Sequence, residues 1–188
     1  MQFENALVAR ICHDLISPFN AINLGVEAFE ATQDAIMFET IKESTAKANA
    51  ILKFMRELFS LKTDGFVYTK TSLQNCASEF LSGYKITFNL QTEMNEIPEM
   101  FGKVVLYLAA ICKDLMPFGG EAFVTLQDSA ITCECHGKNM KVPDINLETE
   151  LTHKTVLQHS LLKQLSELKC KLIASQEENK IVIKITAV

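Results

Sequence analysis

Residues 8–29 have the sequence VARICHDLISPFNAINLGVEAF. Apolar or small residues recur in it at alternating steps of three and four, which is the spacing of one face of an α-helix. They are Val8, Ile11, Leu15, Pro18, Ile22, Gly25 and Phe29. At about 100° per residue, His13 lies roughly 180° from this apolar line. We therefore expect a long helix, from about Phe3 to Ala31, that carries His13 on its outer face.

The expected outer face around His13 consists of small or polar residues that would let another protein approach closely. They are Ala6, Ala9, Arg10, Ser17 and Asn20. An exposed imidazole can act as a nucleophile. Exposed helical histidines are more often solvated surface residues, so the pattern alone leaves both interpretations open.

A second helix is expected after a short turn at residues 32–34, with Asp34 as its N-cap and about Lys62 as its end. It repeats the three-four spacing at Phe38, Ile41, Thr45, Ala48, Leu52, Met55 and Phe59. An isolated hairpin of two such helices leaves much apolar surface in water. We therefore expect residues 1–63 to form an antiparallel hairpin that pairs with a second copy as a dimeric four-helix bundle.

From residue 64 onward, short alternating strands and amphipathic helices predict an α+β fold, with an α/β sandwich over residues 64–188. Strands are expected at 66–71, 85–91, 121–127, 130–135, 171–175 and 180–186, and helices at 72–84, 98–116 and 147–168. Phe54, Leu58 and Leu61 form an apolar patch near the end of the second helix. We expect the sandwich to dock on this patch.

The composition is typical of a globular protein, with 48% hydrophobic and 22% charged residues. A net charge of −5 and the lack of any Lys/Arg run argue against a nucleic-acid partner. The sequence contains neither a secretory signal nor an apolar stretch of membrane-spanning length. We therefore expect a cytoplasmic protein without membrane association.

Six cysteines are scattered through expected helices and strands, which is typical of reduced thiols in a reducing compartment. Cys133, Cys135 and His136 are candidates for a metal site. Alternation along a strand places the two thiols on one face and the imidazole on the other, and the sequence offers no fourth ligand nearby. A structural role is the favoured interpretation, and we expect no metal.

The stretch from Arg10 to Pro18 (RICHDLISP), followed by Ala21-Ile22 and Gly25-Val26-Glu27, resembles the phosphoacceptor helix of ChpT-type histidine phosphotransferases of alphaproteobacteria. It resembles the H-box of sensor histidine kinases more loosely. A fair likeness extends over residues 106–120. The resemblance implies that residues 1–63 form a dimerisation and phosphoacceptor domain, and that residues 64–188 form a degenerate histidine-kinase ATPase-like domain.

In that family the second domain does not bind ATP, and two features of this sequence agree. The expected helix 98–116 contains no asparagine where kinases place ligands for Mg²⁺ and phosphate. No Asp-x-Gly-x-Gly motif follows it, and the corresponding place reads CECHGKN at residues 133–139. We therefore expect no ATP binding, and a divergent ATP-dependent histidine kinase is the less favoured alternative.

The resemblance implies a histidine phosphotransferase in a multistep phosphorelay. His13 would accept a phosphoryl group from the receiver aspartate of a CckA-like hybrid histidine kinase and pass it to CtrA-like or CpdR-like response regulators. The partner receiver domain is implied to bring the aspartate, Mg²⁺ and a lysine, so no intrinsic cofactor is expected. A non-catalytic dimeric adaptor that binds receiver domains is the other alternative.

Three neighbours of His13 have candidate roles in transfer, and each of them also has a purely structural alternative. Asp14 can accept a hydrogen bond from the imidazole, or pair with Arg10 at the i,i+4 spacing as a surface ion pair. Arg10 can also reach the phosphohistidine. Ser17 can approach the phosphoryl group or bond to the main chain.

The expected partner-docking surface includes Ile16, because kinases commonly carry a basic residue three positions after the histidine and this chain does not. Leu24 lies on the same side of the helix. The remaining expected docking positions are Ala6, Ala9 and Asn20.

Overall fold

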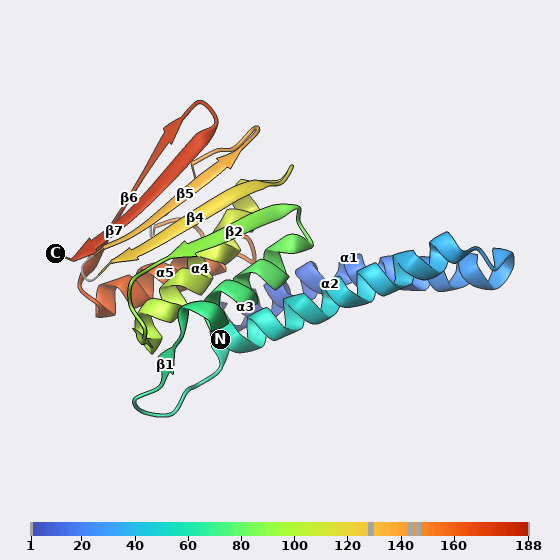
Figure 1. Ribbon diagram of the computed structural model, residues 1–188, viewed down its shortest axis with the longest axis horizontal. Helices are drawn as coiled ribbons and strands as arrows, with labels where there is room; N and C mark the ends of the chain where they lie inside the picture. The colour runs from blue at the N-terminus through green and yellow to red at the C-terminus, as the bar shows by residue number, and fades with distance from the viewer. Residues whose placement is uncertain (1, 128–129, 143–144, 146–147, 188) are drawn as a thin grey trace.

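The computed structural model describes residues 2–127, 130–142, 145 and 148–187. Two long helices, α1 (Gln2–Thr32) and α2 (Ala35–Phe59), form a hairpin that extends as an arm from the rest of the molecule (Figure 1). The remaining elements form an α/β domain at the base of this arm. In chain order they are β1 (Val67–Tyr68), α3 (Lys70–Ser82), β2 (Ile86–Gln91), β3 (Ile97–Pro98), α4 (Glu99–Leu115), β4 (Gly120–Gln127), β5 (Ala130–Gly137), α5 (Val156–Glu167), β6 (Cys170–Glu177) and β7 (Lys180–Ala187).

The hairpin has the turn and the close packing that its sequence suggests. Asp34 caps α2, because its carboxylate accepts a hydrogen bond of 2.8 Å from the backbone N–H of Ile36. Gly25 lets the helices approach closely, since a Cβ at this position would lie 2.8 Å from Cγ1 of Ile41. Both helices are thus confirmed, although α2 ends at Phe59, slightly before the expected end.

Five strands form a mixed sheet in the order β2-β4-β5-β7-β6, in which only β2 and β4 pair in parallel. Helices α3, α4 and α5 cover one face of this sheet, on the side of the hairpin (Figure 1). Alternate residues of β5 and β7 on this face are buried, as a half-covered sheet requires. They are Ile131, Cys133, Cys135, Ile181, Ile183 and Ile185. The predicted α+β class is confirmed.

The structure differs from the predicted elements mainly in short or irregular segments. The helix expected from Leu147 begins only at Val156, and Leu147 itself lies outside the described residues. The helix expected from Ser72 begins at Lys70, because the Thr69 side chain caps it by accepting a hydrogen bond from the backbone N–H of Ser72. The two-residue strand β3 was not predicted, since so short a strand has no periodicity.

The α/β domain docks on the end of α2 as expected from Phe54 and Leu58, both of which are buried. The Phe54 ring stacks on that of Phe80 in α3, with 3.9 Å between the ring centroids. The expectation for Leu61 is wrong, because this residue follows the end of α2 and is 97% exposed. The helical spacing that grouped it with the other two residues does not continue beyond Phe59.

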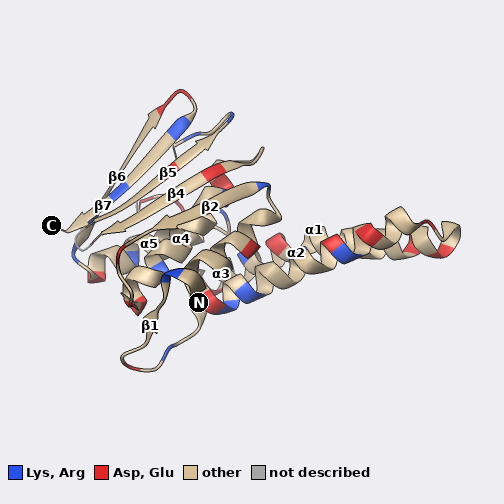
Figure 2. Cartoon of the chain, viewed as in Figure 1, with Lys and Arg blue, Asp and Glu red and all other residues tan. Residues whose placement is uncertain are grey.

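Charged residues of both signs are interspersed over the hairpin and the α/β domain, as Figure 2 shows. One ion pair joins the two regions at the surface, where Lys53 Nζ in α2 lies 2.8 Å from a carboxylate oxygen of Glu79 in α3. In the described part of the chain, every helix is too short or too polar to span a membrane.

Candidate phosphoacceptor site

His13 lies on the outer face of α1, where its side chain is 64% exposed. This placement agrees with the helical periodicity of the sequence. The ring is close to the α/β domain, because the imidazole of His153, just before α5, lies 5.1 Å away between ring centroids. The candidate nucleophile is therefore open to solvent on one side and borders the α/β domain on the other.

Asp14 lies beneath His13 and links it to two cations, the buried Arg10 and the half-buried Lys113. Its Oδ1 atom is 3.3 Å from Nδ1 of His13 and accepts a hydrogen bond of 2.6 Å from Lys113 Nζ. Its Oδ2 atom accepts a bond of 2.9 Å from Arg10 Nε. Burial alone would raise the pKa of Asp14, but Lys113 and Arg10 outweigh it and lower this pKa below its ordinary value. Asp14 is thus held as a carboxylate.

Arg10 connects Asp14 to the end of α4 and to the segment before α5. Its Nη2 atom donates to Asp114 Oδ1 at 2.7 Å, and its Nη1 atom donates to the His153 carbonyl oxygen at 3.5 Å. Burial opposes the charge, yet Asp114 and Asp14 together raise the pKa of Arg10. Burial lowers the pKa of Lys113, and the nearby Arg10 lowers it further. We call Arg10, Asp14, Lys113 and Asp114 the ion-pair network.

The placement of Arg10 and Ala6 on the exposed face with His13 is wrong. Both residues are buried, because the α/β domain covers a second face of α1 that an isolated hairpin would leave in water. The Arg10–Asp14 pair forms at its expected i,i+4 spacing, but it is a buried pair and not a surface one. The exposed positions among those expected to contact a partner or the phosphoryl group are Ala9, Ile16, Ser17, Asn20 and Leu24.

Sequence reasoning missed Lys113, Asp114 and His153, which lie about a hundred or more positions after the residues they contact. A weak signal was present for the first two. The helix that contains them is apolar over most of its length. Two adjacent charges in its last turn therefore indicate that oppositely charged residues lie nearby, because an unpaired charge beside a core is costly. The partners themselves follow only from the tertiary structure.

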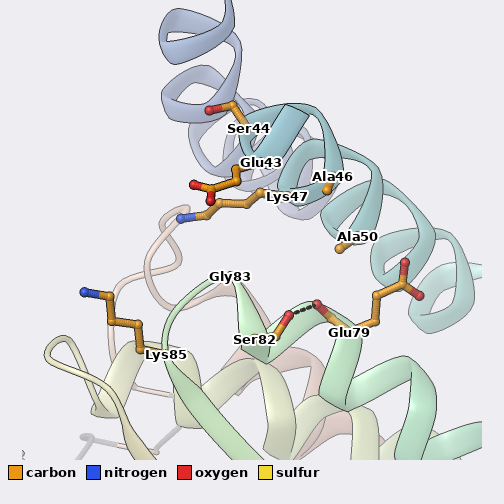
Figure 3. Close-up of a pocket in the computed structure, with 9 residues that line it drawn as sticks. All are labelled: Glu43, Ser44, Ala46, Lys47, Ala50, Glu79, Ser82, Gly83 and Lys85. Atoms are coloured by element: carbon orange, nitrogen blue, oxygen red, sulfur yellow. Dashed lines mark hydrogen bonds between the residues drawn. The ribbon is translucent and has the colours of Figure 1, made fainter. Parts of the chain in front are cut away.

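A polar groove lies between α2 and the turn that joins α3 to β2 (Figure 3). The groove is lined by Glu43, Ser44, Ala46, Lys47, Ala50, Glu79, Ser82, Gly83 and Lys85. Lys47 Nζ lies 4.4 Å from the centroid of the Tyr84 ring, and Lys113 Nζ lies 5.1 Å from the same centroid. One aromatic ring therefore separates this groove from the ion-pair network.

The possible metal ligands are arranged differently from the sequence-based candidates. Cys133 and Cys135 are buried on one face of β5 and His136 is not buried, as alternation predicts. Cys112 of α4 joins the two thiols, so the group contains three sulfurs and no imidazole. This cluster lies in the core of the α/β domain and is separate from the phosphoacceptor site.

Comparison with known proteins identifies relatives with the same architecture. Residues 71–154 match the family model described as the histidine phosphotransferase C-terminal domain. The protein phosphotransferase ChpT of Brucella abortus (strain 2308) is 33% identical over 150 residues, which cover 76% of this chain and 71% of that protein.

Solved structures agree with these sequence matches. A bacterial phosphotransferase determined at 1.7 Å has a TM-score of 0.83 and 26% identity, covering 97% of this chain and 95% of its own. The Acinetobacter baumannii histidine kinase AdeS has a TM-score of 0.50 and 11% identity, covering 93% of this chain and 96% of its own. The second match shows a shared fold alone.

The helical hairpin, the kinase-like α/β domain and these matches define the class of the protein as a histidine phosphotransferase. At 33% identity over most of both sequences, the chain belongs to the family of the protein phosphotransferase ChpT. Its similarity to ChpT supports a role as a phosphoryl carrier in a phosphorelay.

Proposed function

We propose that His13 is the phosphoacceptor of this protein and that its Nε2 atom is the nucleophile. The observation that carries this proposal is the 3.3 Å separation between Nδ1 of His13 and the carboxylate of Asp14. A carboxylate at this position favours the tautomer with the proton on Nδ1. The lone pair is then on Nε2, the nitrogen farther from Asp14.

Transfer then requires one bond exchange. Nε2 attacks the phosphorus of an aspartyl phosphate, a nitrogen–phosphorus bond forms, and the bond from phosphorus to the aspartate oxygen breaks as the carboxylate leaves. The reverse exchange passes the group to another receiver domain. Positioning and cationic charge provide most of the stabilisation in such a step. Asp14 orients the ring, and Lys113 and Arg10 fix Asp14.

The proposal assigns the Mg²⁺ and the reacting aspartate to the partner receiver domain, and no intrinsic cofactor to this chain. Donors of the CckA-like hybrid-kinase type and acceptors of the CtrA-like or CpdR-like type are the partners that the family resemblance implies. They would dock on α1 around His13, at Ala9, Ile16, Ser17, Asn20 and Leu24, all of which are exposed. Small side chains at Ala9 and Ser17 leave space for a receiver beside the imidazole.

A homodimer is proposed because the hairpin exposes large apolar side chains on both helices. They include Val8, Phe19, Val26, Ile36, Phe38 and Leu52. Surface of this kind is typical of helices that pack against a partner. The limits of the two functional regions, residues 1–63 and 64–188, are part of the same proposal.

The transfer proposal is tested by mixing the purified protein with a receiver domain that carries labelled phosphate on its aspartate. The expected result is acid-labile, base-stable label on His13 that is absent from His13→Ala and retained by His136→Ala, a matched change on the far strand β5. Labelling of a different residue would contradict the assignment. No labelling with any phosphorylated receiver would support the adaptor alternative.

We also propose that the protein does not autophosphorylate with ATP, because α4 carries no asparagine and no Asp-x-Gly-x-Gly motif follows. The test is incubation of the protein alone with labelled ATP and Mg²⁺. No label is expected on His13. Label that appears in the wild type and not in His13→Ala would establish the divergent-kinase alternative.

A further inference from the structure

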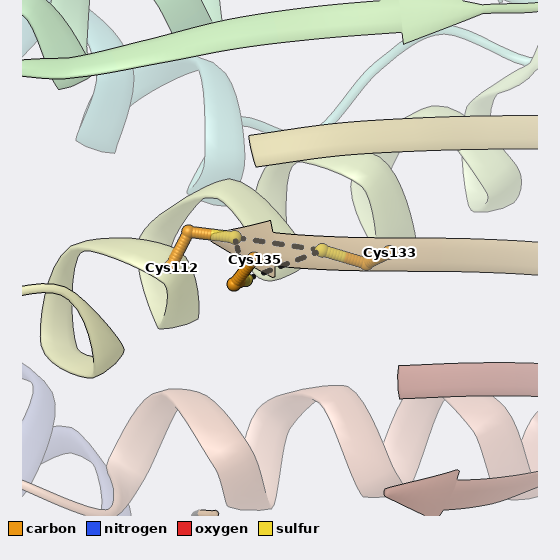
Figure 4. A group of neighbouring side chains, drawn as sticks. All are labelled: Cys112, Cys133 and Cys135. Carbon is orange, nitrogen blue, oxygen red and sulfur yellow. Dashed lines mark hydrogen bonds between the residues drawn. The ribbon is translucent and has the colours of Figure 1, made fainter. Parts of the chain in front are cut away.

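Three thiols meet in the core of the α/β domain, between α4 and β5 (Figure 4). The Sγ atom of Cys112 lies 3.5 Å from that of Cys133 and 3.3 Å from that of Cys135, and the last two sulfurs are 3.9 Å apart. All three residues have no exposed surface. Each sulfur therefore contacts the other two in a closed triangle.

The sheet residues that flank the triangle are apolar. In the part of the chain that the structure describes, no His, Asp or Glu joins the three thiols within ligand distance. Cys133 pairs across the sheet with Val124 and Ile183, and Cys135 pairs with Ala122 and Ile181. A bound ion would thus have three sulfur ligands in an apolar environment.

An apolar environment favours a bound ion whose charge neutralises that of the three thiolates. Three thiolates with a divalent ion carry a net charge of −1, and with a monovalent ion −2, and a net charge is costly in an apolar core. Zinc would also lack the fourth ligand of its structural sites. A trivalent ion with three thiolates is neutral, and the trivalent state of arsenic or antimony binds three sulfurs without a fourth ligand.

The geometry agrees with the same choice. If each sulfur lies about 2.3 Å from a common atom, as in zinc–thiolate bonds, separations of 3.3 and 3.5 Å correspond to angles of about 90–100°. These angles are smaller than tetrahedral and fit a pyramid of three sulfurs beneath one atom with a lone pair. The third separation of 3.9 Å corresponds to a wider angle of about 116° at the same bond length, and it reaches the same range if one thiol rotates about χ1 and shortens this separation by about 0.4 Å.

We propose that Cys112, Cys133 and Cys135 form a binding site for trivalent arsenic or antimony, taken up as arsenite or antimonite. The reaction is an exchange without oxidation or reduction. Three S–H bonds and three arsenic–oxygen bonds break, three arsenic–sulfur bonds form, and the protons leave in three water molecules. The product ties α4 to β5 one residue before Lys113, so binding stabilises the α/β domain.

The test titrates the reduced, full-length protein with arsenite and measures bound arsenic after gel filtration. One arsenic per chain is expected, with three sulfur neighbours and no oxygen in X-ray absorption spectra, and with a raised melting temperature. Removing one of three tethered ligands in Cys133→Ala or Cys112→Ala should weaken binding by about 10²-fold or more. Cys12→Ala, Cys76→Ala and Cys170→Ala, which change thiols outside the cluster, should bind as the wild type does.

If a core variant does not fold, the X-ray absorption spectrum of the wild type still tests the site, because it gives the number of sulfur neighbours of the bound arsenic. Fewer than three sulfur neighbours, or no arsenic retained, would overturn the site. Zn²⁺ or Cd²⁺ retained in preference to arsenite would overturn the argument from neutral charge. The outcome is independent of phosphotransfer, because His13 takes no part in this site.

Discussion

The hairpin and the α/β domain differ in how far their apolar residues are buried. Every residue of α4 from Val104 to Cys112 is buried, so the α/β domain closes around its own core. Helix α1 buries few residues, and two of them, Arg10 and Asp14, are charged. The hairpin thus presents the imidazole of His13 and exposed apolar side chains. The charges beneath the imidazole come from both regions, Arg10 and Asp14 from α1 and Lys113 and Asp114 from α4.

This difference suggests that the hairpin exposes the candidate nucleophile and that the α/β domain fixes the residues around it. A phosphoryl carrier must expose its nucleophile to several partners, and an exposed side chain on a lone helix is poorly fixed. Lys113 and Asp114, at the end of the buried helix α4, provide fixed points for Asp14 and Arg10. We therefore expect the α/β domain to fix the position of the side chains around His13.

The largest effect is expected where the two regions join. Phe54→Ala removes a ring that stacks on Phe80 in the core, so the free energy of unfolding should fall by about 3–5 kcal/mol. Leu61→Ala, an apolar change at an exposed position in the following segment, should stay within about 0.5 kcal/mol. Urea denaturation of both variants measures the difference. Equal losses would show that the junction does not depend on this stacking.

The next effect concerns the charges beneath His13. Asp14→Asn removes the carboxylate that bonds to both Arg10 and Lys113 and leaves Asp114 as their remaining anionic partner. The free energy of unfolding should therefore fall by about 3 kcal/mol and transfer should slow by about 10–100-fold. Asp64→Asn is the matched exposed control and should leave both quantities unchanged. Rapid-quench transfer assays and denaturation measure the two losses. A stable variant with full transfer would contradict the supporting role of the network.

The same carboxylate predicts a dependence of stability on pH. Because the pKa of Asp14 is lower in the folded protein than its ordinary 3.8, its contribution is fully present above that value. It is lost as the pH falls from there toward the folded pKa, where the unfolded chain takes up the proton first. The stability difference between wild type and Asp14→Asn should therefore shrink below about pH 4. A constant difference from pH 6 to pH 3 would contradict this.

The smallest effect is expected on the open face of α1. Ile16→Asp places a carboxylate beside the docking site of an anionic aspartyl phosphate, so transfer should slow by about tenfold without loss of folding or dimer. Ile173→Asp, an equally exposed change on the edge strand β6, should leave transfer unchanged. The comparison uses transfer rates at equal receiver concentration. Identical rates for both variants would remove Ile16 from the docking surface.

Periodicity predicted those features that depend on neighbours in sequence. The two helices of the hairpin, the exposure of His13 and the alternation of Cys133 and Cys135 all follow from residue spacing, and the structure agrees. Periodicity failed for Arg10 because it assumes that a helix has one apolar partner. A second covering element buries a face that is polar in sequence. The carboxylates that compensate for the burial of Arg10 come from that element, at Asp114, and from α1 itself, at Asp14.

The remaining features require contacts between distant segments. Lys113 reaches Asp14 across 99 positions, and Cys112 reaches Cys133 across 21. No local pattern encodes either distance. The family resemblance made His13 the candidate phosphoacceptor without these contacts, but it could not show that Lys113 and Arg10 hold Asp14 as a carboxylate.

We propose that Asp14 holds the proton on Nδ1 of His13 and so directs phosphorylation to Nε2. Heteronuclear NMR of the isotopically labelled, phosphorylated protein tests it directly, because the coupling to phosphorus identifies the nitrogen that carries the group. The expected result is phosphorus on Nε2 of His13. Phosphorus on Nδ1, or on any other residue, would contradict it.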